Sequence, residues 1–271
     1  MKFKIGFATE KEEKVEPVTC ITPPPKEEAV KSLVQVKFSS KNTPLTYYND
    51  KFNLKKGDLV YVEGKLEGQR GTVVEVEYNF KIKLSEYKRV IAVVDTEVHG
   101  QLFMASSHFV TFDPTTLPKE QIATWFKAPD AEEDEYVSNF GDDTSFALSN
   151  LQEFKISHEI ADRGFDYYCE GCIRYISVDG AKGYAIVEGT ESYEIEFTYA
   201  DGQISHIICS CPCAYHCKHE FATLLELREM LEIIEKNYSD KYEESGYFAA
   251  ICKATLFRYS IYSKDNGSIT L

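Results

Sequence analysis

The feature that most constrains this chain is a dense run of metal-ligand side chains in its last third. Four of the eight cysteines fall within nine residues, and two histidines share the run, which comprises Cys209, Cys211, Cys213, His216, Cys217 and His219. Thiolate and imidazole groups at such short spacing are typical of zinc sites, whereas buried structural cysteines are usually scattered. The run therefore predicts a metal centre around which the neighbouring elements must fold.

Elementary geometry allows four of these residues to act together as ligands. In an extended strand, residues i and i+2 point to the same side, so Cys209 and Cys211 can present both sulfurs together. Cys217 and His219 lie where a helix is expected to begin, and the free amides of a first turn favour anionic sulfur. Three thiolates and one neutral imidazole form a common tetrahedral set for Zn²⁺. A closed set of this kind indicates structural zinc and leaves no open position for catalysis.

The segments on both sides of the run have clear periodicity. Strands are expected over 184–188, 193–199 and 204–208, and Asp201-Gly202 is a strong hairpin turn between the last two. In the strand expected over 193–199, alternation puts Ile195 and every second residue from it on one face. The acidic residues lie on the other face. The acidic residues are Glu194 and Glu196, which we interpret as a solvated face.

An amphipathic helix is expected directly after the run. Apolar residues recur there at i, i+3, i+7 and i+10, as Leu224, Leu227, Leu231 and Ile234. This spacing places them in one stripe along a helix.

The order Cys-x-Cys, a gap, then Cys-x-His, between a β-meander and an apolar helix, resembles the SWIM zinc finger. The stretches typical of that family stand here as Cys209 to Pro212 and Cys217 to His219, and residues 184–193 are similar to the strand pair that leads into such fingers. The resemblance covers roughly residues 160–235. It implies a module that binds DNA or protein, because SWIM fingers occur as accessory modules in helicase-like ATPases and transposases. No ATPase or transposase motif accompanies it in this chain.

Some alternatives remain open at this point. The gap between the two halves of the motif is short and contains Cys213 and His216, so either could replace a ligand; a register with Cys211 and Cys213 is one such case. Pro212 after the second cysteine favours Cys209, as in the family. Cys169 and Cys172 have the spacing of half a metal site or a redox pair, but no second pair accompanies them.

The first half of the chain is rich in short strands. Strands are expected over 33–38, 58–63, 71–77 and 89–95, with glycine-containing turns between them, a pattern that favours a small antiparallel β-barrel. A short helix is expected over 117–126. Further helix is expected over 145–160, with strand structure beginning near Tyr167.

Residues 57–76 resemble a KOW-type motif, with glycines that allow a tight loop between two strands. That resemblance implies binding of RNA or protein, as in the ribosome and the transcription machinery. Residues 51–89 contain nine Lys/Arg and six Asp/Glu, with tyrosine and phenylalanine between them. Basic groups contact phosphate and aromatic rings stack on bases, so this region is compatible with a nucleic-acid face. The lysines selected are Lys55, Lys56, Lys81 and Lys83.

We therefore expect an α+β protein with an extended N-terminal arm (1–32), a small β-barrel domain with a short helix (33–128), an acidic linker (129–137) and a SWIM zinc-finger domain (138–271). Residues 131–271 have 11 basic and 26 acidic side chains, which opposes phosphate contact and favours docking of a protein there.

The expected function is that of a non-enzymatic zinc-binding interaction protein. Its partner is expected to be protein, DNA or RNA, and a barrel-based RNA- or DNA-binding adaptor in transcription or a mobile element is the alternative. Neither a secretory segment nor a membrane span is evident, and reduced thiols are expected, so the prediction is a cytoplasmic protein. No phosphate-binding loop or nucleophile motif points to an enzyme or a small-molecule substrate.

Overall fold

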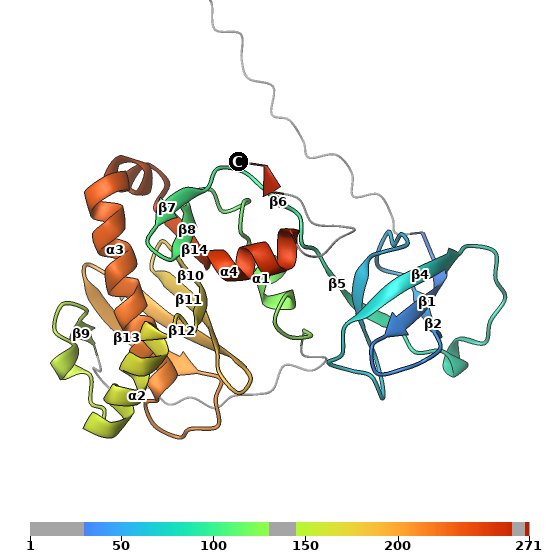
Figure 1. The fold of residues 1–271 in the computed structure, drawn as a ribbon, viewed down its shortest axis with the longest axis horizontal. Helices are drawn as coiled ribbons and strands as arrows, with labels where there is room; N and C mark the ends of the chain where they lie inside the picture. The colour runs from blue at the N-terminus through green and yellow to red at the C-terminus, as the bar shows by residue number, and fades with distance from the viewer. Residues whose placement is uncertain (1–29, 130–144, 262–268, 271) are drawn as a thin grey trace, which may run out of the picture.

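A computed structural model describes residues 30–129, 145–261 and 269–270 of the chain. The predicted N-terminal arm (1–32) and acidic linker (129–137) lie almost entirely outside these residues. The described part contains two antiparallel sheets and several helices, as Figure 1 shows. The α+β class predicted from the sequence is confirmed.

The first sheet has five strands in the spatial order β2-β1-β4-β3-β5. The strands are β1 (Ser32–Phe38), β2 (Leu45–Asn49), β3 (Leu59–Val62), β4 (Gly71–Glu77) and β5 (Val90–Val94). Four of them coincide with the strands predicted from alternation. The ladder is open, with one isolated bridge between Tyr48 and Arg89, so the predicted closed barrel is not confirmed.

The second sheet has eight strands in the order β7-β8-β14-β10-β11-β12-β13-β9. These are β7 (Phe103–Ala105), β8 (His108–Thr111), β9 (Phe146–Ala147), β10 (Ile173–Asp179), β11 (Lys182–Glu188), β12 (Ser192–Ala200), β13 (Gln203–Cys209) and β14 (Tyr247–Cys252). Strands β10 to β13 form the predicted meander, with the Asp201-Gly202 turn between the last two. A separate parallel pair joins β6 (Val98–His99) to β15 (Ile269–Thr270).

The helices lie on the two faces of the second sheet. They are α1 (Lys119–Thr124), α2 (His158–Cys169), α3 (Lys218–Ser245) and α4 (Lys253–Leu256), with short turns η1 (Leu84–Glu86), η2 (Leu151–Glu153) and η3 (Phe257–Ile261). Helix α3 packs its apolar stripe on one face, where Leu224, Leu227 and Ile234 are buried against strand residues such as Ile195. The stripe predicted for this helix is confirmed.

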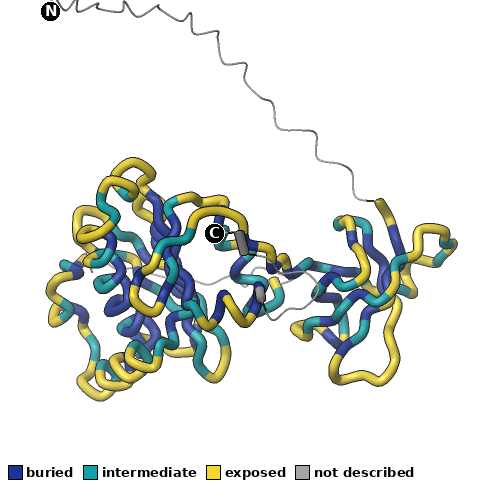
Figure 2. The backbone as a smooth tube through the Cα atoms, turned by 45° about the horizontal axis from the view of Figure 1, so that its top comes forward, coloured by how far each residue is buried: buried dark blue, intermediate teal, exposed yellow. Residues whose placement is uncertain are grey.

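The opposite face of the second sheet is covered by α1, α4 and the edge of the first sheet. A second core cluster there combines Trp125 and Leu256 from the helical segments with Tyr175 from β10 and Tyr61 from β3. Two hydrogen bonds reinforce the contact: the Tyr61 hydroxyl donates to the Thr124 carbonyl, and the Trp125 indole donates to the Asp95 carbonyl. Figure 2 shows the buried strand residues in dark blue and the exposed loops in yellow.

Several expectations differ from the structure. Most of the helix expected over 145–160 is instead β9 and the turn η2, because Phe146 and Leu148 alternate and pack into the core on one side. Helix α2 begins only at His158, after its N-cap Ser157, whose hydroxyl accepts from the Ile160 amide. It covers the residues near Tyr167 that were expected as strand. Strand β8, within the predicted first domain, pairs with β14 of the second sheet.

None of the described helices has an apolar stretch long enough to cross a lipid bilayer.

Candidate metal centre

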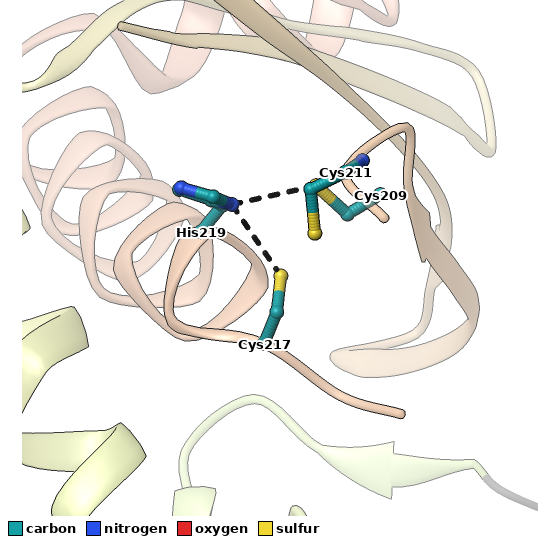
Figure 3. Close-up of side chains that lie close together, drawn as sticks. All are labelled: Cys209, Cys211, Cys217 and His219. Atoms are coloured by element: carbon teal, nitrogen blue, oxygen red, sulfur yellow. Dashed lines mark hydrogen bonds between the residues drawn. The ribbon is translucent and has the colours of Figure 1, made fainter. Parts of the chain in front are cut away.

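The four side chains predicted as ligands come together between the end of β13 and the start of α3. The ligand atoms of Cys209, Cys211, Cys217 and His219 all lie within 4.8 Å of one another. Figure 3 shows two cysteines from the strand end facing Cys217 and the imidazole on the first turn of the helix. Cys211, Cys217 and His219 are buried, and Cys209 is half-buried. The cluster could hold one metal ion.

The spacing can be compared with what one ion requires. His219 Nδ1 lies 3.7 Å from the Cys209 sulfur and 3.7 Å from the Cys217 sulfur. Zinc–sulfur bonds of about 2.3 Å and zinc–nitrogen bonds of about 2.1 Å place sulfur and nitrogen about 3.6 Å apart in a tetrahedron. These two distances therefore fit a tetrahedral ion of that size, with Nδ1 as the coordinating nitrogen.

A β-bulge in β13 turns Cys209 toward the helix. Ile204 and Cys209 both lie on the α3 face although they are five residues apart, a spacing that puts side chains on opposite faces of a regular strand. The register with β12 shifts between Glu196 and Thr198, and His206 opposite has φ of 52°. The extra residue in β13 thus returns Cys209 to the α3 face of the sheet. There Cys209 pairs with Ile195 of β12.

The first turn of α3 fixes the other two ligands. Cys217 is the N-cap residue of α3, and its backbone amide donates to the Glu220 carboxylate at 3.1 Å. His216 Nδ1 lies 2.9 Å from the same carboxylate oxygen. This is the reciprocal half of a capping box, with cysteine in the place usually taken by serine or threonine. Glu220 was not among the predicted site residues, although its position three residues after Cys217 is the sequence signal of a capping box.

Two aromatic side chains hold the imidazole of His219. The Tyr193 ring stacks on it with centroids 4.3 Å apart, and the Tyr167 ring meets it edge-on at 5.4 Å. Tyr167 is itself held by Lys218, whose ammonium donates to its hydroxyl at 2.7 Å. Packing from two sides leaves the imidazole little freedom to rotate, so Nδ1 stays directed at the sulfurs. No sequence pattern pointed to these two tyrosines.

The protonation of the cluster is uneven. A hydrogen bond from Cys209 lowers the pKa of the Cys217 thiol to about 4, and the bond with His219 acts in the same direction. The pKa of Cys209 is raised, chiefly because its thiol is the partner in that hydrogen bond. Burial raises the pKa of Cys211 to about 12. Cys217 is thus the most acidic thiol of the cluster, and a bound metal ion would displace the protons of the coordinating thiols.

The alternative ligands lie apart from the cluster. The Cys213 side chain is exposed, and His216 packs against the Phe154 ring and Glu220. Cys169 is exposed and Cys172 half-buried, and neither belongs to a group of potential metal ligands among the residues described.

The four lysines predicted to contact nucleic acid are exposed on two different loops. Lys55 and Lys56 precede β3, and Lys81 and Lys83 lie between β4 and η1. Lys83 forms an ion pair with Glu86 at 3.6 Å.

Comparison with known proteins gives no relative: no protein-family model, curated protein sequence or solved structure matches the chain.

A glycine at the contact between α2 and α3 provides a test of how the centre is supported. A Cβ at Gly164 would lie 2.9 Å from the Lys218 carbonyl oxygen and 2.9 Å from the Phe221 ring. Glycine to alanine in a helix ordinarily gains about 1 kcal/mol. Here we expect Gly164→Ala to lower the free energy of unfolding by about 1–3 kcal/mol, because α2 must move away from α3. Urea titration measures this, and Arg163→Ala on the exposed side of α2 is the control. Equal or greater stability of Gly164→Ala would contradict the tight contact.

Proposed function

We propose that this chain is a non-enzymatic zinc-binding interaction protein. The observation that supports this most directly is the convergence of three sulfurs and His219 Nδ1 within 4.8 Å. A Cys₃His set favours Zn²⁺ over harder cations such as Mg²⁺ or Ca²⁺, which prefer oxygen ligands. Because four protein side chains complete a tetrahedron, the ion would be structural and would fix the end of β13 against α3.

We further propose that residues 160–235 form a SWIM-like module. The supporting features are the order of the ligands, the meander of β10 to β13 before them and the long helix α3 after them. A module of this type is a docking surface for protein or DNA. The acidic excess in residues 131–271 disfavours phosphate, so the partner we propose for this half is a protein.

Co-purification of the full-length chain from its native cells, with and without nuclease, tests the nature of the partner. A protein partner should remain after nuclease treatment and should be lost with Cys209→Ser, which removes a ligand. Cys213→Ser should retain it, because Cys213 is exposed outside the cluster. A partner that disappears with nuclease would contradict protein docking and indicate a nucleic-acid bridge.

The alternative proposal is an RNA- or DNA-binding adaptor in which the first sheet makes the contact. It is supported by the exposure of Lys55, Lys56, Lys81 and Lys83 on two loops of a net basic region. If it holds, changing all four to glutamine should weaken binding of a mixed-sequence oligonucleotide by at least about tenfold and flatten its salt dependence. Fluorescence anisotropy at several salt concentrations measures both. Quadruple replacement of Lys155, Lys182, Lys236 and Lys241, which are exposed in the second half, is the control. Unchanged affinity and slope would exclude the first sheet as the contact surface.

A further inference from the structure

The face of the second sheet opposite α3 contains a cleft of about 960 Å³. It is lined by residues of β10, β11, β12, β13 and β14, and the segment from Pro114 to Glu120 forms one wall. Three tyrosines lie in it, Tyr175, Tyr184 and Tyr247, together with the carboxylates of Asp179, Glu194 and Glu196. The acidic face of β12, interpreted from the sequence as solvated, thus lines an aromatic cleft. A volume of this size accommodates a small organic ligand.

The cleft already holds an ammonium group of the protein itself. Lys119 Nζ lies 4.2 Å from the centroid of the Tyr184 ring and 3.0 Å from a carboxylate oxygen of Glu196. Lys127 Nζ also forms an ion pair with a carboxylate oxygen of Glu194, at 3.2 Å. Aromatic faces and carboxylates together are the environment that recognises alkylammonium groups. The side chain of Lys119 is substantially exposed, at 42%, so its ammonium can leave the ring without disturbing the core.

A second observation points to a missing ligand. Tyr184 is 4% exposed and lines the cleft, yet its hydroxyl has no hydrogen-bond partner within the part of the chain that the structure describes. Leaving a buried hydroxyl without a partner costs stability, and such groups in native proteins call for an explanation. Burial and the charge of Glu194 raise the pKa of Tyr184, so the hydroxyl is neutral and able to accept an N–H bond.

We propose that this cleft binds an alkylammonium ligand, which donates to the Tyr184 hydroxyl and pairs with Glu194 and Glu196, with Lys119 as its intramolecular competitor. The acidic excess of residues 131–271 adds a favourable field for such a cation. The ammonium can belong to a free polyamine or to a lysine side chain of a peptide, and the two present the same group to the cleft. This site goes beyond the proposed zinc-dependent docking and does not require it.

Isothermal titration of the full-length chain at low salt tests the proposal with two probes, spermidine and an acetylated, amidated trilysine peptide. We expect one saturable site for at least one probe; tighter binding of spermidine assigns a free polyamine, and tighter binding of trilysine assigns a peptide lysine. Tyr184→Phe should weaken binding about fivefold through the lost hydrogen bond. The double variant Glu194→Gln, Glu196→Gln should weaken it more than about tenfold. Lys119→Met should tighten binding severalfold, because it removes the competitor.

Matched variants outside the cleft separate a built site from general attraction to an acidic protein. The double variant Glu243→Gln, Glu244→Gln and the single variant Lys236→Met make the same changes in charge at exposed positions on α3 and should leave the affinity unchanged. Circular dichroism confirms folding of each variant, and Lys119→Met, at a substantially exposed side chain, keeps the test valid if Tyr184→Phe is unstable. The proposal is overturned if neither probe saturates, if Lys119→Met binds no more tightly than Lys236→Met, or if Glu243→Gln, Glu244→Gln weakens binding as much as Glu194→Gln, Glu196→Gln.

Discussion

Replacing Cys217 with serine is expected to abolish metal retention and to lower the thermal midpoint by on the order of 10 °C. Binding of structural zinc contributes about 10 kcal/mol in small zinc-dependent domains. The second sheet has a large core of its own, so we expect a loss of several kcal/mol rather than complete unfolding; a protein of this size shifts its midpoint by about 2–4 °C per kcal/mol. Differential scanning calorimetry with and without a chelator measures the effect.

Cys213→Ser is the matched control for that experiment, because it removes a thiol from the same loop but outside the cluster. A chelator should lower the midpoint of the wild type and of Cys213→Ser to the value of Cys217→Ser, and should leave Cys217→Ser itself unaffected. Buried thiols without a metal would give a different result: a small loss for Cys217→Ser and no effect of the chelator on any of the three proteins.

The second large effect concerns a buried pair between β8 and α3. His108 and Glu226 are both almost fully buried, with His108 Nδ1 3.1 Å from a carboxylate oxygen of Glu226. The second ring nitrogen of His108 lies 3.0 Å from the Ile173 carbonyl oxygen. Burial raises the pKa of Glu226 to about 8, aided by the charge of Glu229, and burial lowers the pKa of His108 to about 4. Both groups are therefore neutral in the folded protein near pH 6.

The raised pKa of Glu226 makes stability fall as pH rises. The unfolded chain loses this proton near its ordinary pKa of 4.5, whereas the folded chain keeps it up to about 8. Between these values the folded state becomes less stable by about 1.4 kcal/mol per pH unit. Glu226→Gln cannot ionise, so its stability relative to the wild type should rise by about 2 kcal/mol between about pH 6 and pH 8. His108 has the opposite sign, losing stability as pH falls from about 6.5 to 4, but it is present in both proteins.

Urea unfolding at a series of pH values measures this difference. Glu232→Gln, exposed on the same helix, is the control for the change in charge and should follow the wild-type curve. Parallel curves for Glu226→Gln and the wild type would show that Glu226 is ionised in the folded state and that the buried pair is charged.

The sequence predicted the local parts of the metal centre because their signals are local. The ligands fall within eleven residues, and the stripe from Leu224 to Ile234 determines which face of α3 packs on the sheet. The bulge at His206 was not predictable, since a single extra residue changes which face Cys209 occupies without altering the alternation on either side. The pairing of His108 with Cys252, which brings β8 into the second sheet, was also not predictable, because the two residues are far apart in the sequence.

Segments 145–160 and 113–120 show a second limit of sequence reasoning. Phe146, Leu148 and Phe154 are compatible with either a helix or a strand followed by a turn, and only the free edge of β13 decides between them, through the pair Phe146 and Ile204. The cleft beside Lys119 depends on the contact of α1 with the second sheet, a tertiary contact with no sequence signal. Glu194 and Glu196 were correctly placed on one face of β12. The segment that lies beside that face could be known only from the structure.

Metal analysis of the purified chain tests the central claim most directly. Plasma mass spectrometry should find about one zinc per chain in the wild type and in Cys213→Ser, and much less in Cys209→Ser, because only the last lacks one of the four converging ligands. A wild-type protein that contains no zinc and takes up none when zinc is added, or a Cys209→Ser protein that retains a full equivalent, would contradict this account.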